Sequence, residues 1–119
     1  MAKKILYIED DRALGDLIIL KLTQAGYEAK HVISVEEAEK RGDFLAELLL
    51  VDQGLPGKQG IEAIPDLQKI FPQAKVVILS NFSDKDHLKR AQENGAADFW
   101  VKVGSLNNIV EQVNKILAS

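Results

Sequence analysis

The sequence predicts a single α/β domain with a doubly wound, five-stranded parallel sheet and helices on both faces. The first observation behind this prediction is a set of short runs that are apolar on both faces, as central strands of a parallel sheet must be. The second is that the stretches between these runs change to a helical period. Alternating units of this kind, joined by right-handed crossovers, give a sheet that helices cover on both sides. The apolar runs are Ile5–Ile8, Leu48–Val51, Val76–Leu79 and Phe99–Val101.

The second strand in chain order differs from the other four. Residues Tyr27–Val32 alternate between apolar and polar side chains, which predicts a strand at the edge of the sheet. The segment before it has one apolar helical face and stops at Gly26, because glycine commonly ends helices. Asp11 is expected to be the N-cap of this first helix. The apolar face consists of Leu14, Leu17, Ile18, Leu22 and Ala25.

The remaining helical segments differ in how much apolar surface they carry. The last helix has the clearest stripe, and Ser105 precedes it as an expected N-cap. The fourth helix, Asp84–Asn94, is expected to open with a capping box from Ser83 and Asp86. It has only Leu88 and Ala91 as inward residues and should be the least firmly packed. Pro65 interrupts the third helical pattern, and we expect a late start or a kink there. The last stripe is Leu106, Ile109, Val110, Val113, Ile116 and Leu117, and the interrupted pattern is Ile61, Ile64, Leu67 and Phe71.

Composition limits the possible classes of function. The chain has 119 residues, which predicts one domain over residues 1–119, and 46% hydrophobic residues are enough for a core. The net charge of −3 argues against direct nucleic-acid binding, because phosphate contacts need clustered Lys and Arg. The absence of cysteine excludes disulfides and thiol catalysis. No run is long enough to span a membrane and there is no signal-peptide pattern, so we expect a cytoplasmic protein.

Reactive side chains follow the apolar runs. Ligands of doubly wound sheets bind beyond the carboxyl ends of the strands, so the first polar residues after each run are the candidate site. Three carboxylates, one hydroxyl and one ammonium group should therefore meet at one edge of the sheet. They belong to Glu9 and Asp10 after the first strand, Asp52 after the third, Ser80 after the fourth and Lys102 after the fifth, with Tyr27–Val32 counted as the second strand.

This set of side chains suits phosphoryl transfer. Clustered carboxylates repel one another, and a hard, oxygen-preferring cation such as Mg²⁺ removes that penalty. Phosphoryl transfer depends on positioning and charge neutralisation, and an aspartate can itself be the nucleophile that forms an acyl phosphate. Lys102 can then pair with a phosphoryl oxygen as a point charge, while Ser80 donates a hydrogen bond.

The whole chain resembles the receiver domain of bacterial two-component response regulators, the CheY-like family. The matching residues are the acids after the first strand, the acceptor with the turn that follows it, and the hydroxyl, glycine-alanine stretch and lysine further on. In order, they are Glu9-Asp10, Asp52, Leu55-Pro56-Gly57, Gly60, Ser80, Gly95-Ala96-Ala97-Asp98-Phe99 and Lys102.

The resemblance implies a fold, a function and partners. It implies the flavodoxin-like strand order 2-1-3-4-5 and a phosphoacceptor that labels itself and is not a turnover enzyme. The phosphoryl group would come from a histidine kinase or a phosphotransfer protein, with Mg²⁺ as cofactor. The output would pass through the face around the fourth helix, fifth strand and fifth helix to an unidentified protein or effector domain, without nucleic-acid or membrane contact.

The resemblance also implies roles for individual residues. Asp52 would be the phosphoacceptor and, with Glu9, Asp10 and the Gly54 backbone carbonyl, would position Mg²⁺. Lys102 would bind a phosphoryl oxygen. The switch would consist of Ser80, whose hydroxyl turns toward the phosphoryl group, and Phe99, whose ring changes rotamer with it.

Four positions depart from the family pattern. Val103 replaces the usual proline after the lysine, so the Lys102–Val103 peptide is expected to be trans, because a cis bond before a non-proline residue costs about 3 kcal/mol. Asn81 replaces a small residue and could crowd access to Asp52, and Gln53 and Gly54 after the acceptor are also unusual. Val103, Asn81 and Gln53 motivate an alternative function, that of a degenerate receiver that acts as a phosphorylation-independent interaction module. The intact set of acids, hydroxyl and lysine argues against this alternative.

Two further classes of protein fit the sequence less well. A metal-dependent phosphatase or nuclease would need an Asp-x-Asp pair at one strand end, and the sequence lacks it. A flavin binder would be repelled by the acids at its phosphate loop. Among single residues, His31 and His87 are expected to be solvated and not to be ligands, and Phe99 and Trp100 are more simply explained as core aromatics.

Overall fold

The computed structural model describes residues 2–55, 57, 59–81 and 85–118 and has the predicted parallel sheet, with strand order β2-β1-β3-β4-β5. Pro56 of the turn motif and Ser83 and Asp84 of the expected capping box lie outside the described residues. Within the described ranges, no helix combines the length and the apolar character that crossing a membrane requires. The elements are β1 (Lys4–Ile8), α1 (Arg12–Gln24), β2 (Glu28–Val32), α2 (Val35–Glu39), η1 (Gly42–Phe44), β3 (Leu48–Asp52), α3 (Gly60–Ile70), β4 (Lys75–Ser80), α4 (Lys85–Glu93), β5 (Asp98–Val101), α5 (Lys102–Ser105), η2 (Leu106–Asn108) and α6 (Ile109–Ala118).

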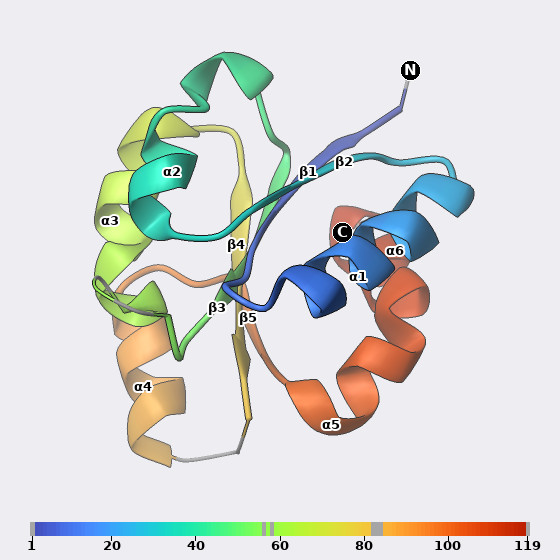
Figure 1. Ribbon diagram of the computed structural model, residues 1–119. Helices are drawn as coiled ribbons and strands as arrows, with labels where there is room; N and C mark the ends of the chain where they lie inside the picture. Colours follow the sequence, from blue (N-terminus) through green and yellow to red (C-terminus); the bar gives the residue numbers. More distant parts are fainter. Residues whose placement is uncertain (1, 56, 58, 82–84, 119) are drawn as a thin grey trace.

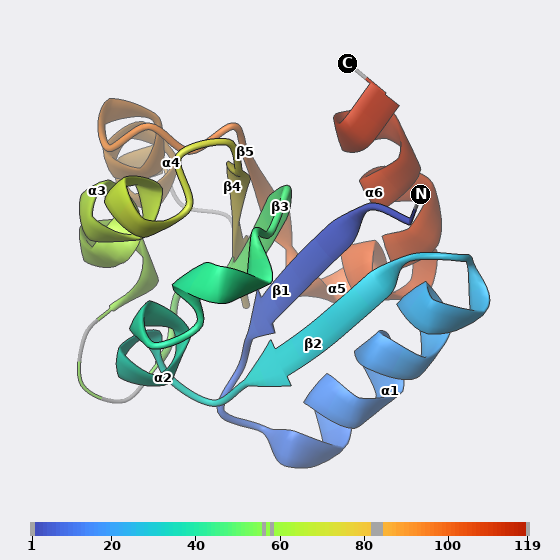
Figure 2. The same ribbon diagram turned by 90° about the horizontal axis from the view of Figure 1, so that it is seen from above.

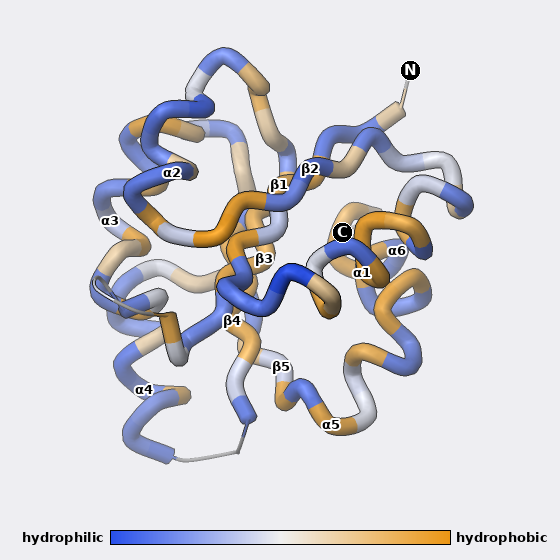
Figure 3. Tube along the Cα trace, viewed as in Figure 1, coloured by the Kyte–Doolittle hydropathy of each residue, from blue (hydrophilic) through white to orange (hydrophobic). Residues whose placement is uncertain are grey.

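Helices cover both faces of the sheet. Figures 1 and 2 show α2, α3 and α4 on one face, and α1, α5 and α6 on the other. Each central strand supplies both hydrophobic cores, because alternate side chains point to opposite faces. On β1, for example, Leu6 and Ile8 belong to the core beneath α3, whereas Ile5 and Tyr7 belong to the core beneath α1 and α6. In Figure 3 the hydrophobic colour accordingly gathers along the strands and the inner sides of the helices.

The register of the strands sets the position of the site. Ile8 of β1 pairs with Val51 of β3, so the residues that follow them leave the sheet at the same edge. Asp52 is the last residue of β3 and lies beside Leu79, one residue before the end of β4. The parallel arrangement therefore brings the polar residues after β1, β3 and β4 to one carboxyl edge, as the sequence predicts.

The first helix confirms its predicted ends but not its whole predicted face. The Asp11 side chain accepts a hydrogen bond from the backbone of Leu14, which makes it the N-cap. Gly26 follows the helix with φ of 98°, a conformation that glycine adopts without strain. The prediction was wrong for Leu17, which is 48% exposed, and for Ala25, which is exposed at the C-cap. Leu17 instead lines the cavity at the carboxyl edge of the sheet.

The third helix begins at Gly60, five residues before Pro65, so the expected late start is wrong. Gln53 explains the early start, because its side-chain oxygen accepts the backbone N–H of Ile61 at 2.8 Å and satisfies one of the unpaired groups of the first turn. Pro65 is exposed, whereas Ile64 and Leu67 are buried. Packing of this apolar face outweighs the backbone hydrogen bond that the proline removes.

Gly60→Ala is expected to destabilise the protein by about 2 kcal/mol, because an added Cβ overpacks the contact between the start of α3 and the end of β3. The Cβ would lie 2.7 Å from the Asp52 backbone oxygen and 3.1 Å from a methyl carbon of Val51. Urea unfolding measures the effect, and Lys69→Ala on the exposed side of α3 is the control. A Gly60→Ala variant as stable as the wild type would show that α3 does not pack tightly on the acceptor strand.

The fourth helix is thinly packed, as expected. Within α4 as described, Ala91 is the one buried residue, whereas Leu88 is 40% exposed, so its assignment as an inward residue was wrong. In Figure 3, α4 is hydrophilic over most of its length. An ion pair between Arg90 and Glu62 connects α4 to α3. Most of the α4 surface therefore faces outward.

The chain after β5 differs most from its prediction. A regular helix capped by Ser105 was expected, but Ser105 makes no side-chain capping hydrogen bond. Instead, α5 is a single irregular turn in which Val103 has ψ of 120° and Gly104 has φ of 92°. A short 3₁₀ segment follows, and α6 begins only at Ile109. The peptide between Lys102 and Val103 is trans, as predicted.

Candidate functional site

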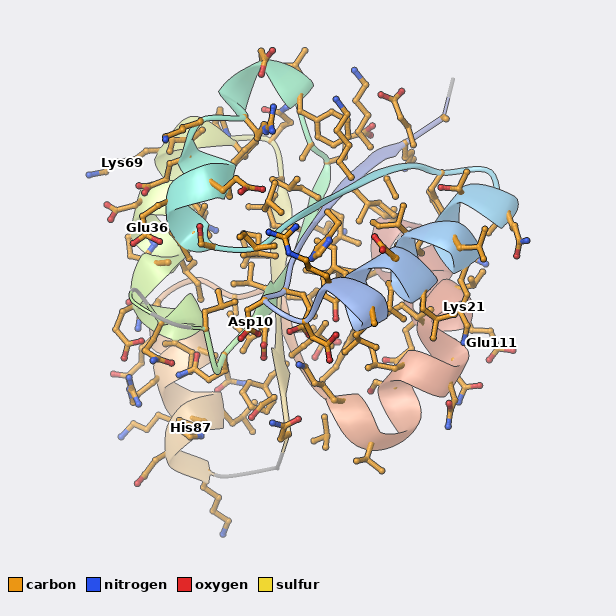
Figure 4. The ribbon with its side chains drawn as sticks, viewed as in Figure 1. Asp10, Lys21, Glu36, Lys69, His87 and Glu111 are labelled. Carbon is orange, nitrogen blue, oxygen red and sulfur yellow. The ribbon has the colours of Figure 1, made fainter. Side chains whose placement is uncertain are left out.

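Three carboxylates meet at the carboxyl edge of the sheet. Glu9 and Asp10 directly follow β1, and Asp52 ends β3. Each offers one carboxylate oxygen such that the three atoms lie within 4.8 Å of one another. Figure 4 shows Asp10 at the end of β1, between the two layers of helices. The predicted acid cluster therefore exists as a geometric unit.

Glu9 is buried, with 1% of its surface exposed, and its carboxylate has several donors. The Tyr7 hydroxyl donates to Oε1 at 3.0 Å, and the Asp11 backbone N–H donates to Oε2 at 3.2 Å. Lys102 also donates to Oε1, at 2.7 Å. Burial and the charge and hydrogen bond of Glu9 raise the pKa of Tyr7 well above its ordinary value, so its hydroxyl keeps its proton and remains a donor.

Lys102 lies between two of the acids. Its Nζ is 2.7 Å from Glu9 Oε1 and 3.2 Å from Asp52 Oδ1. Burial alone would lower the pKa of Lys102, but the hydrogen bond to Glu9 and the charges of Asp52 and Glu9 leave it raised above its ordinary value. The ammonium group is therefore a fixed positive charge in the cluster, although the residue after it is not proline.

Asp52 is 4% exposed and forms the floor of an open cavity. Its Oδ1 accepts the Gly54 backbone N–H at 3.2 Å in addition to the contact with Lys102. The cavity has a volume of about 710 Å³ and runs from the acids along α1 to α5. Its lining includes Leu14, Leu17, Lys21, Asn81, Val103 and Leu106. A reactant can reach the acceptor strand through this cavity.

The electrostatics of the cluster suit a divalent cation. The hydrogen bond with Glu9, with smaller contributions from burial and from the charge of Glu9, raises the pKa of Asp10. Glu9 thus disfavours the ionised form of Asp10, and an oxygen-preferring cation would remove that penalty. The three carboxylates supply the oxygen ligands that Mg²⁺ or Ca²⁺ prefers, so the donor set fits a metal. Gly54 lines the same cavity.

The other predicted site residues lie on the strands β4 and β5. Ser80 is 3% exposed at the end of β4, on the strand next to Asp52. Phe99 on β5 is half-buried and packs against the core beneath α3 and α4. Trp100, the neighbouring core aromatic, faces the other core. Asn81 lines the cavity beside Asp52, which is where its bulk would affect access.

Two residues outside the predicted set are part of the site. Tyr7 was expected only as a member of an apolar strand, and His31 was expected to be solvated, which is wrong. His31 Nε2 lies 2.6 Å from the Glu9 backbone oxygen, and because a carbonyl only accepts, Nε2 carries the proton. The sequence spacing could have indicated Tyr7, because it precedes Glu9 by two residues and side chains two apart share one face of a strand. His87 is half-buried on α4, away from Asp10 (Figure 4).

A parallel sheet of this strand order, with acids and a lysine at its carboxyl edge, places the chain in the doubly wound α/β class. The family model of the response regulator receiver domain matches residues 5–114. The chain belongs to the response regulator receiver domain family, and so to two-component signal transduction.

Similar proteins agree with this assignment. The chain is 31% identical to the chemotaxis protein CheY of Thermotoga maritima over 118 residues, which cover 98% of each chain. A CheY-like receiver domain protein from Methanospirillum hungatei has the same fold, with a TM-score of 0.90, 24% identity and coverage of 99% of this chain and 95% of that one. A response regulator from Burkholderia pseudomallei, solved with a phosphorylated aspartic acid, a calcium ion and citrate, has a TM-score of 0.83 and 23% identity. That match covers 91% of this chain and 64% of the other.

Proposed function

We propose that the protein is a phosphoacceptor that takes a phosphoryl group onto Asp52 and changes its surface in response. The observation that carries this proposal is the position of Lys102 Nζ, 3.2 Å from Asp52 Oδ1 and 2.7 Å from Glu9 Oε1. A buried carboxylate at the floor of an open cavity, next to a fixed ammonium group, is suited to become an acyl phosphate. A phosphorylated aspartic acid in the structurally similar Burkholderia protein supports the same chemistry.

The transfer requires one bond to form and one to break. Because Lys102 and the Gly54 N–H engage Oδ1, we assign the attack on phosphorus to Oδ2 of Asp52. The bond from phosphorus to the nitrogen of a phosphohistidine donor breaks, and the donor imidazole keeps that electron pair. Lys102 then exchanges part of its contact with Asp52 for a phosphoryl oxygen. The protein labels itself in this way and is not a turnover enzyme.

A divalent metal completes the proposed site. Glu9, Asp10 and Asp52 would hold it, together with the Gly54 backbone carbonyl, and Mg²⁺ is the cation we propose. Its chemical contribution is to neutralise charge between the acids and the incoming phosphoryl group. The chain's own residues orient the acceptor and balance the product charge.

The proposed partners follow from this chemistry. The donor is a histidine kinase or a phosphotransfer protein, whose phosphohistidine would enter the cavity between α1 and α5. The proposed output surface is the face around α4, β5 and α6, with Ser80 and Phe99 as the switch. The single buried residue of α4 and the half-buried ring of Phe99 support this choice, because weakly packed elements move most readily. The downstream target is a protein or effector domain.

Intact-mass measurement after incubation with acetyl phosphate and Mg²⁺ tests the proposal. We expect one phosphoryl adduct per chain, absent when a chelator is present during the incubation, and peptide mapping should place it on Asp52. Beryllofluoride with Mg²⁺ should give the matching noncovalent complex. A chain that stays unmodified in both experiments would instead be a degenerate receiver, the function that Val103, Asn81 and Gln53 favour on sequence.

A further inference from the structure

Glu9 is held in place through both its backbone and its carboxylate. Its backbone is held on both sides, because its N–H donates to the Val32 oxygen at 3.0 Å and its carbonyl accepts from His31 at 2.6 Å. Its carboxylate accepts three further hydrogen bonds, two of them on the same oxygen. Those donors are the Tyr7 hydroxyl, the Asp11 backbone N–H and the Lys102 ammonium group.

Tyr7 and His31 form one unit beneath Glu9. They are paired across β1 and β2, and their ring centroids lie 6.0 Å apart. Tyr7 is fully buried, so its hydroxyl has a fixed position on the Glu9 side of the strand. His31 is fixed from its other side by α1, where Gly15 is buried and an added Cβ would lie 2.3 Å from the imidazole ring. Residues of β1, β2 and α1 thus together hold Glu9 in position.

The two donors on Oε1 act in opposite ways. Lys102 draws the Glu9 carboxylate toward itself, across the cluster toward Asp52. The Tyr7 hydroxyl retains the same oxygen on the β1 side. Without Tyr7, Lys102 would be the remaining donor to Oε1, with the Asp11 backbone N–H still on Oε2, and the carboxylate would lose its contact on the β1 side. Partners that orient a ligating carboxylate in this way commonly change metal affinity by about 10- to 100-fold when they are removed.

We propose that Tyr7 and His31 are positioning residues that hold Glu9 in the orientation required for the divalent metal. Tyr7 fixes the carboxylate and His31 fixes the backbone, with the ring of His31 seated where Gly15 has no side chain. This inference rests on the metal site of the proposed function and adds two residues to it. Both would act through Glu9, and neither is among the three residues that would hold the metal.

Tyr7→Phe is the direct test, because it removes the hydroxyl and keeps the buried ring. Mg²⁺ titration by calorimetry should show about tenfold weaker binding than in the wild type. The Mg²⁺ concentration for half-maximal labelling by acetyl phosphate should rise by the same factor. Tyr27→Phe is the matched control, since the Tyr27 hydroxyl contacts Asn114 away from the site and its removal should leave both values unchanged.

A double-mutant cycle between Gly15 and His31 tests the second positioning residue. Gly15→Ala should weaken Mg²⁺ binding, because its Cβ would push the imidazole off the Glu9 carbonyl. His31→Ala should weaken it similarly. In the His31→Ala background, Gly15→Ala should have no further effect, since the ring that it displaces is gone. Additive effects would show that Gly15→Ala acts through α1 and not through His31.

The outcomes separate this inference from the proposed function. A wild-type protein that binds no Mg²⁺ would contradict the proposed metal site itself. A wild-type protein that binds Mg²⁺ and a Tyr7→Phe variant that binds it equally or more tightly would overturn the inference alone. Urea unfolding of each variant identifies any that fails to fold, and Tyr7→Phe, which keeps the packed ring, remains the deciding one.

Discussion

Asp52→Asn is expected to abolish labelling by acetyl phosphate and Mg²⁺ while leaving the fold intact. An amide has no carboxylate oxygen to form the acyl phosphate, so no adduct can form at this position. The change keeps the size of a side chain that is 4% exposed, and it removes a negative charge from a cluster in which Glu9 and Asp10 already repel each other. We expect a stability change below about 1 kcal/mol in urea unfolding, because lost pairing with Lys102 and relieved repulsion offset each other.

The same variant should bind Mg²⁺ about tenfold more weakly, because one of three ligating carboxylates is lost. Asp43→Asn, an exposed position on η1, is the matched control and should label normally. A residual adduct on the Asp52→Asn protein that maps to Asp10 would move the acceptor to the β1 side of the cluster. An unfolded variant would be replaced by Asp52→Ala, which removes the charge and the nucleophile without adding bulk.

The acid cluster could be predicted from sequence because its position follows from strand geometry. Parallel strands present their carboxyl ends at one edge, so polar residues after apolar runs must meet there. That rule places Asp52 and Lys102 at one edge, and the structure brings them to 3.2 Å. It depends only on the order of the runs and not on details of packing.

The hydrogen bonds that support the site residues could not be predicted from the sequence, because they depend on the pairing register of the strands and on the path of the loops. Tyr7 belongs to a strand buried on both faces, where an aromatic residue is ordinarily explained by packing. His31 reaches Glu9 only because β2 pairs with β1 at the Tyr7–His31 register. Gln53 was noted only as an unusual residue, but it supplies the hydrogen bond acceptor that lets α3 begin ahead of Pro65. In each case a side-chain hydrogen bond decided the role of the residue, and the apolar and polar pattern of the sequence does not show such bonds.

Lys102→Ala is expected to separate metal binding from phosphorylation. The ammonium group acts as an internal cation for Glu9 and Asp52, and its side chain is only 12% exposed. Its removal leaves two buried carboxylates without their counter-charge, so the metal-free protein should lose about 3 kcal/mol of stability in urea unfolding. Mg²⁺ should then bind about tenfold more tightly, because it no longer competes with a fixed positive charge.

Labelling by acetyl phosphate should nevertheless fall by about 100-fold even at saturating Mg²⁺, because the charge that neutralises the developing acyl phosphate is missing. Lys21→Ala is the matched control, since Lys21 lines the same cavity from α1 but lies away from the labelled Asp10 (Figure 4). Lys102→Arg, which keeps the charge, should restore the stability of the metal-free protein and only part of the labelling. Tighter Mg²⁺ binding combined with lost labelling would show that Lys102 neutralises charge on the phosphoryl group and is not needed to bind the metal. Normal labelling would instead reduce it to a structural counter-ion for Glu9.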